Sequence, residues 1–87
     1  MHSQDLKQLK KIANDLKSQF NLGKTGINKA FTEQIDKYLK VHGIVKIKDL
    51  SSASKNDTAG KADRLAKQLN AIILSKKGFT FVLYREE

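Results

Sequence analysis

The apolar segment Phe79–Tyr84 near the C-terminus restricts the fold more than any other stretch of the chain. Successive side chains of a strand point to opposite faces of a sheet, so Phe81 and Leu83 share one face while Val82 and Tyr84 share the other. A strand that is apolar on both faces requires cover on both. We therefore expect a β-sheet with helices over at least part of each face.

Helical and strand-like patterns alternate through the rest of the chain. Apolar residues recur at helical spacing in three segments, and short runs rich in β-branched or aromatic residues separate these segments. The expected elements are a helix over residues 3–17 with Ser3 as N-cap, a strand at 20–22, a helix between Asn28 and Gly43, a strand at 44–50, a helix capped by Asp57 or Thr58, and a hairpin of 71–74 with 79–84.

This order, α-β-α-β-α-β-β, predicts one α/β domain of the α+β type. A strand-helix-strand crossover makes the first two strands parallel if they are neighbours, whereas the final hairpin is antiparallel. With 39% apolar residues, the 87-residue chain has material for one core. We expect residues 1–87 to form a four-stranded mixed sheet packed with three helices.

The charge of the chain favours a polyanionic partner. Seventeen Lys and Arg against nine Asp and Glu give a net charge of +8, and residues 1–50 carry more of this excess than residues 51–87. Lysines can also serve solubility alone. The chain has no cysteine and only two histidines, His2 and His42, so we expect no metal, no cofactor and no enzymatic activity. Without an apolar span or secretory signal, a cytoplasmic location is expected.

Residues 23–26, GKTG, are compatible with three kinds of structure. A P-loop requires a glycine five positions before the Gly-Lys pair, and Ser18 stands there, which argues against nucleotide hydrolysis. A Gly-x-x-Gly turn between a strand and a helix instead lets a polymer backbone approach closely, while amide groups and the positive helix end attract a phosphate. A tight turn that happens to contain a lysine is the third possibility.

Lys29 favours the phosphate interpretation. It follows the expected N-cap Asn28, and a cation in the first helical turn opposes the helix dipole. A bound phosphate would relieve this conflict. Lys24 and Thr25 would add a positive charge and a hydroxyl donor.

Three segments in order, LGKTGIN (22–28), HGIVKIK (42–48) and GFTFVLYR (78–85), resemble the CRM domain of the YhbY-like family. These small RNA-binding proteins are linked to ribosome maturation. The family is similar in architecture to the C-terminal domain of translation initiation factor three, and its glycine loop resembles the backbone clamp of KH domains. The resemblance implies binding of structured ribosomal or precursor RNA, in assembly or maturation of the large subunit.

The resemblance assigns RNA contacts to the glycine loop and to the basic strand after it. We add the neighbouring polar and basic positions to this set. The predicted RNA-binding residues are Gly23, Lys24, Thr25, Gly26, Asn28, Lys29, Lys46, Lys48, Lys76 and Lys77.

Other roles and partners remain open at this point. Because the domain is short of apolar material, we expect its aromatic residues to pack in the core rather than stack on bases, and His42 to act near a helix C-terminus. With few arginines, backbone and shape recognition is favoured over base readout. A DNA-binding module and a basic adaptor for an acidic protein are the alternatives, and a monomer is favoured.

Overall fold

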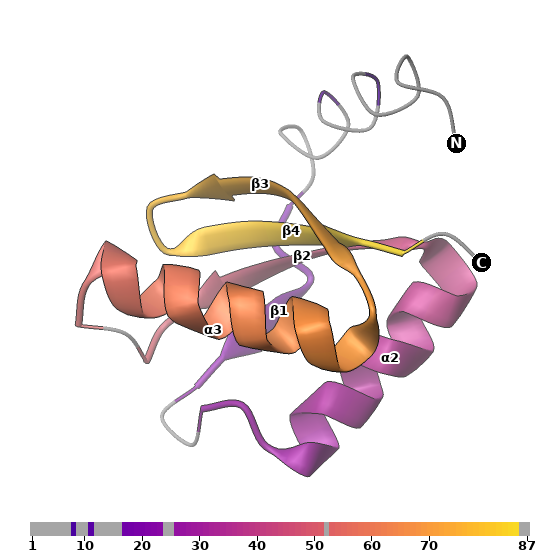
Figure 1. The fold of residues 1–87 in the computed structure, drawn as a ribbon, viewed down its shortest axis with the longest axis horizontal. Helices are drawn as coiled ribbons and strands as arrows, with labels where there is room; N and C mark the ends of the chain where they lie inside the picture. Colours follow the sequence, from indigo (N-terminus) through magenta and orange to yellow (C-terminus); the bar gives the residue numbers. More distant parts are fainter. Residues whose placement is uncertain (1–7, 9–10, 12–16, 24–25, 52, 86–87) are drawn as a thin grey trace.

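The computed structural model describes residues 8, 11, 17–23, 26–51 and 53–85, and shows a sheet with two helices (Figure 1). The elements are β1 (Phe20–Leu22), α2 (Lys29–His42), β2 (Ile44–Asp49), α3 (Lys55–Leu69), β3 (Ile72–Lys77) and β4 (Thr80–Tyr84). Gln8 and Lys11 are helical, but the rest of the predicted first helix, apart from Lys17, lies outside the described residues. The expected total of three helices is therefore not confirmed.

The four strands form one mixed sheet in the order β1-β2-β4-β3. β1 pairs in parallel with β2, and Phe20 lies opposite Ile47. This is the arrangement predicted for a strand-helix-strand crossover. β4 pairs antiparallel with both β2 and β3. The short β1 and the hairpin strand β3 are the two edges of the sheet.

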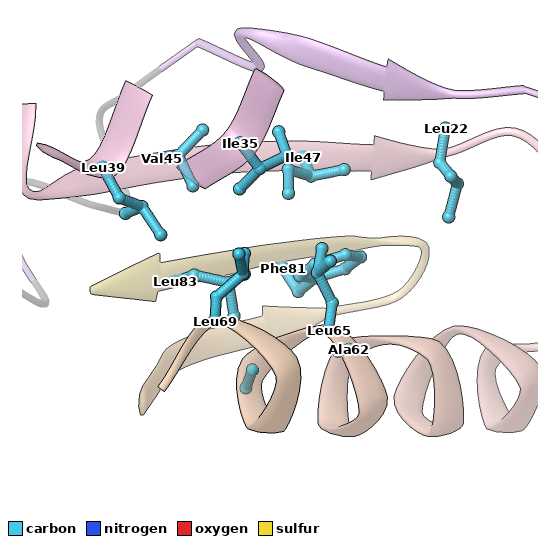
Figure 2. Close-up of a cluster of buried hydrophobic side chains, with 11 residues drawn as sticks. Leu22, Ile35, Leu39, Val45, Ile47, Ala62, Leu65, Leu69, Phe81 and Leu83 are labelled. Atoms are coloured by element: carbon cyan, nitrogen blue, oxygen red, sulfur yellow. The ribbon is translucent and has the colours of Figure 1, made fainter. Parts of the chain in front are cut away.

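The main core lies between one face of the sheet and the two described helices. Alternation brings Val45 and Ile47 of β2 to the same face as Phe81 of β4, and all three are fully buried. Helical spacing brings Ile35 of α2 and Leu65 of α3 onto them. Figure 2 shows these side chains meeting between the elements. Each buried aliphatic or aromatic side chain contributes roughly 1.5–3 kcal/mol to folding.

β4 is buried on both faces, as its sequence predicts. Val82 faces away from the main core and is 2% exposed, and it forms a second cluster with Leu74. Ile44 and Tyr84 pack against this cluster. Since α2 and α3 both cover the opposite face, the prediction that helices lie on each face is confirmed for one face among the described residues.

The predicted limits of α2 are confirmed. The Asn28 side chain accepts a hydrogen bond from the Phe31 amide at 2.8 Å, which makes Asn28 the N-cap. Gly43 has φ of +76° and its amide donates to the Leu39 carbonyl, so it ends the helix in the left-handed conformation that favours glycine. Lys40 and His42 lie in the last turn, where positive charge is favourable.

The predicted start of α3 is wrong. Its N-cap is Ser54 rather than Asp57 or Thr58, because the Ser54 side chain accepts from the Asp57 amide. Asp57 instead lies in the first turn, where its charge complements the helix dipole. The polar composition of residues 51–56 concealed this cap, although Ser54 and Asp57 have the three-residue spacing of a capping box.

The hairpin is also tighter than predicted. β3 extends to Lys77, through residues expected to form the connection, so Gly78 and Phe79 alone make the turn. Gly78 has φ of +57°, which suits a two-residue hairpin. A register irregularity between Ile73 and Ser75 shifts the pairing of β3 by one residue. Neither α2 nor α3 is long and apolar enough to cross a membrane.

Candidate nucleic-acid interface

The connection from β1 to α2 contains Gly23 and Gly26, and we call it the glycine loop. It lies at the same end of the sheet as the end of β2 and the β3–β4 turn. Leu22, the last residue of β1, is paired with Asp49, the last residue of β2. The Leu50 amide donates to the Leu22 carbonyl, and the Asp49 amide donates to the Phe79 carbonyl of the hairpin turn at 2.7 Å. The loop, the end of β2 and the β3–β4 turn are therefore held together by main-chain hydrogen bonds.

The loop closes through a main-chain bond between its two glycines. The Gly26 amide donates to the Gly23 carbonyl at 2.9 Å, and Gly26 has φ of +70°. This backbone conformation favours glycine at position 26. A Cβ at either glycine would meet no atom within 4 Å, so both Cα atoms border open space. Lys24 and Thr25 lie outside the described residues, and their roles stay predictions.

The Gly26 amide is consequently not available to a ligand, contrary to our expectation of unpaired loop amides. The amides that point outward belong to the start of α2, where the first residues of a helix have no carbonyl one turn earlier to bond. The Asn28 side chain accepts a hydrogen bond from the Phe31 amide, and the Asn28 carbonyl accepts one from the Thr32 amide. The amides of Lys29 and Ala30 remain at the tip of the helix.

The electrostatics at this tip favour an anion. The first turn of α2 contains no acidic residue, and Lys29 is exposed there. A depression of about 390 Å³ opens beside it. The lining residues are Ile27, Asn28, Lys29, Thr32, Glu33 and Gln68. Glu33 lies one turn into the helix, and its carboxylate would repel an anion. A bound anion is therefore favoured only at the outer end of the depression.

Three of the predicted sheet lysines share one face of the sheet. The register aligns Lys48 of β2, Thr80 of β4 and Lys77 of β3 in a row. This row lies on the face opposite α2 and α3, and Lys46 lies on the same face two residues before Lys48. The row crosses the sheet at the end that carries the glycine loop.

Lys76 is separated from this row. It pairs with Phe81, whose side chain points into the main core, so the register assigns Lys76 to the helix-covered face. The predicted residues thus lie on different surfaces near the glycine loop. Lys29 is at the start of α2, whereas Lys48 and Lys77 are on the sheet face opposite the helices. No described group of three or more His, Asp or Glu residues could hold a metal ion.

A buried polar cluster beside the loop was not predicted. The Asp49 carboxylate accepts hydrogen bonds from the Ser51 amide at 2.9 Å, the Ser51 hydroxyl at 2.7 Å and the Thr58 hydroxyl at 3.1 Å. Lys61 Nζ lies 3.6 Å from the carboxylate and donates to the Ser51 hydroxyl. The cluster fixes the start of α3 to the end of β2.

The sequence does contain a signal for this cluster. Val45, Ile47 and Asp49 alternate along β2, so Asp49 occupies an inward position, where an acid requires partners. Its side chain is fully buried. The lysines between these positions predict a basic face, but the alternation does not identify the partners of the inward acid.

Arg85 forms a second anchor, which joins the middle of α2 to the last residue of α3. Its guanidinium donates to the Asp36 carboxylate at 2.7 Å and to the carbonyls of Asp36 and Leu69. The hydrogen bond from Arg85 is the main reason that the pKa of Asp36 lies below its ordinary value, and Lys40 at 3.4 Å lowers it further. Arg85 is therefore occupied within the protein.

Comparison with known proteins agrees with this architecture. The sequence model of the CRS1/YhbY (CRM) domain matches residues 1–85. The chain belongs to the CRM domain family. A solution structure of hypothetical protein SAV1595 from Staphylococcus aureus, described as a candidate RNA-binding protein, superimposes with a TM-score of 0.81 and 25% identity over 100% of this chain and 90% of that one. No match was found among curated protein sequences.

Proposed function

We propose that this CRM-domain protein binds structured RNA, with ribosomal or precursor RNA of the large subunit as its target. The observation that carries the proposal is the start of α2, whose first turn contains no acidic residue and which follows two glycines whose Cα atoms border open space. Family membership and the SAV1595 neighbour support RNA binding at the coarser level. The protein acts as a binding module rather than as an enzyme.

We call the start of α2 and the two glycines before it the phosphate clamp. Its chemistry follows from the geometry of the helix start. Oxygens of one phosphate accept hydrogen bonds from the amides of Lys29 and Ala30, while the positive end of the α2 dipole and the Lys29 ammonium attract its charge. Bare Cα atoms at Gly23 and Gly26 allow the ribose chain to pass close to the loop. We extend the proposal to Lys24 and Thr25, which would add a positive charge and a hydroxyl donor.

Other phosphates of the same RNA contact the lysine row. Neighbouring strands lie about 4.8 Å apart, so Lys48 and Lys77, two strands from one another, are separated by about 10 Å across the sheet. Lys46 extends the positive surface along β2, and Lys76 contributes from the hairpin edge. Of the two arginines, Arg85 is occupied by Asp36, so recognition of backbone and shape dominates over readout of guanine edges.

A pair of variants at Gly26 tests the clamp. Asn and Asp have the same shape and both tolerate positive φ, but only Asp places a negative charge beside the phosphate. We expect Gly26→Asp to bind a structured RNA about tenfold more weakly than Gly26→Asn, since an added like charge beside a bound anion costs about 1 kcal/mol or more. Circular dichroism establishes that both variants are folded. Equal affinities of the two variants would contradict the clamp.

Crosslinking in cells, followed by sequencing of the bound RNA, tests the identity of the target. We expect the recovered RNA to be dominated by large-subunit ribosomal RNA and its precursors, in the cytoplasm and bound to a monomer. Preference for duplex DNA over structured RNA in vitro would favour a general nucleic-acid module. Capture of an acidic protein that persists after ribonuclease treatment would favour an adaptor.

A further inference from the structure

A second surface feature lies along α2, away from the glycine loop. Between β1 and the outer side of α2 there is a groove of about 330 Å³, which we call the aromatic groove. Its lining residues are Phe20, Gln34, Lys37, Tyr38, Val41 and His42. Phe20 belongs to β1, and the other five residues recur at helical spacing on α2, beside the stripe that packs into the core.

The rings of the groove form an ordered series. Phe20 meets Tyr38 edge to face, with centroids 5.2 Å apart and planes at 86°. Tyr38 stacks on His42, with centroids 4.2 Å apart and planes inclined by 33°. Phe20 and Tyr38 are half-buried against the core, whereas His42 is exposed. The series therefore begins at the core and ends at the surface.

Core packing does not account for the outer part of the groove. Val41 is 77% exposed, the largest value among the exposed large apolar side chains of the described residues. It lies one position before His42 in the last turn of α2, where the core uses only Leu39. An apolar side chain and an aromatic ring thus border solvent together.

We propose that the aromatic groove stacks an unpaired base of the bound RNA, a contact that rests on the proposed function. A nucleobase presents a flat apolar face, which stacks on Tyr, Phe or His rings. The Gln34 amide offers both a donor and an acceptor to the edge of the base. Lys37 lies beside the groove to contact the adjoining phosphate.

Charge favours a nucleotide over a peptide as occupant. The lining residues include a lysine and a histidine but no acid, and the neighbouring Asp36 is engaged by Arg85 and Lys40. The chain as a whole carries +8. A positively charged groove with stacked rings is complementary to an anionic chain that carries π-systems, which describes single-stranded RNA.

The two contacts can act on one RNA molecule. Along an α-helix each residue rises about 1.5 Å, so Tyr38 lies roughly 15 Å from Asn28 along α2. A phosphate held at the start of α2 and a base held near its end would therefore align an unpaired segment with this helix. The base contact confines RNA recognition to targets that have an unpaired segment at this distance.

A double-mutant cycle between protein and RNA tests the proposal. The RNA pair is a short oligouridylate and the abasic ribose-phosphate oligomer of the same length, which carry the same phosphates. The protein pair is the wild type and His42→Ala. We expect the wild type to bind the oligouridylate at least about fivefold more tightly than the abasic oligomer. His42→Ala should lose most of this preference and bind the abasic oligomer as the wild type does.

Tyr38→Phe is the matched control, because it keeps the ring and should keep the preference for bases. A wild type that binds both oligomers equally, with Gly26→Asp weakening both, would overturn the base contact and leave the phosphate clamp standing. If the wild type bound neither these oligomers nor structured RNA, both proposals would fail. Self-association that is lost in Val41→Ser, with RNA affinity unchanged, would assign the groove to a second copy of the chain and overturn the proposal.

Discussion

The β1–α2 and β2–α3 junctions of this domain lie at the same end of the sheet. They differ in whether a carboxylate of the protein is present at the junction. Where β2 leads into α3, the Asp49 carboxylate is buried and accepts three hydrogen bonds from Ser51 and Thr58. Where β1 leads into α2, the first helical turn contains no acid. One junction therefore contains its own anion, and the other is left open to an anion from outside.

The caps of the two helices show the same difference. Both helices begin with a lysine, Lys29 in α2 and Lys55 in α3, and both have a polar N-cap. Only α3 has an acid in its first turn, Asp57, which offsets its dipole. A lysine at a helix start is therefore not by itself a binding signal. The absence of a compensating acid distinguishes α2 from α3.

The largest expected effect is on stability, at the closed junction. Asp49→Ala removes the acceptor of the Ser51 and Thr58 hydrogen bonds and the ion partner of Lys61. Removing one partner of a buried polar cluster should lower the free energy of unfolding by about 3 kcal/mol, measured by denaturant titration. RNA affinity of the folded fraction should not change.

Asp63→Ala is the control for this prediction, because Asp63 is an exposed acid on the same helix. Its effect on the free energy of unfolding should stay within about 0.5 kcal/mol. Similar losses in both variants would show that the Asp49 cluster is no more important than surface charge. Loss of RNA affinity in folded Asp49→Ala would show that the closed junction also binds RNA.

The next largest effect is on RNA affinity, when the lysine at the start of each helix is replaced by glutamate. Lys29→Glu and Lys55→Glu place the same charge at the first residue of each helix, and each should stabilise its helix by about 0.3–1 kcal/mol through the dipole. Only Lys29→Glu should weaken RNA binding, by about tenfold, because it places a carboxylate at the phosphate site. Binding titrations at fixed salt measure both. Equal losses of affinity would remove the distinction between the junctions.

A last pair of effects concerns two glycines, Gly60 in α3 and Gly26 before α2. Gly60 lies inside α3, and a Cβ there meets nothing within 4 Å, so Gly60→Ala should raise the free energy of unfolding by up to about 1 kcal/mol. Gly26 has φ of +70°, so Gly26→Ala should lower the free energy of unfolding by about 1–2 kcal/mol. Thermal unfolding of both variants checks the signs. A stabilised Gly26→Ala would contradict the loop conformation.

Local chemistry explains which parts of the structure could be predicted from the sequence. The ends of α2 were predictable because Asn28 and Gly43 act on their immediate neighbours. The parallel pairing of β1 and β2 followed from the crossover between them. The start of α3 was misplaced because Ser54 stands in a uniformly polar segment with several possible caps.

Features that depend on contacts between distant segments were not predictable. The inward position of Asp49 indicates that it needs partners, but no local pattern identifies Thr58 and Lys61 of α3 as those partners. The register irregularity in β3 decides which of the adjacent residues Lys76 and Lys77 shares a face with Lys48, and the sequence pattern does not indicate this irregularity. The aromatic groove combines Phe20 of β1 with residues near the end of α2, so it appears only in the folded chain. The glycine loop could be predicted from the sequence, but the hydrogen bond from the Gly26 amide to the Gly23 carbonyl could not.

The most direct test of the open junction is to record the amide resonances of the protein by NMR while a structured RNA is added. We expect the amide resonances of Lys29 and Ala30, at the start of α2, to shift in proportion to bound RNA, while those of Lys55 and Asn56, at the start of α3, stay in place. Shifts at Lys55 and Asn56 without shifts at Lys29 and Ala30 would show that RNA does not bind at the start of α2.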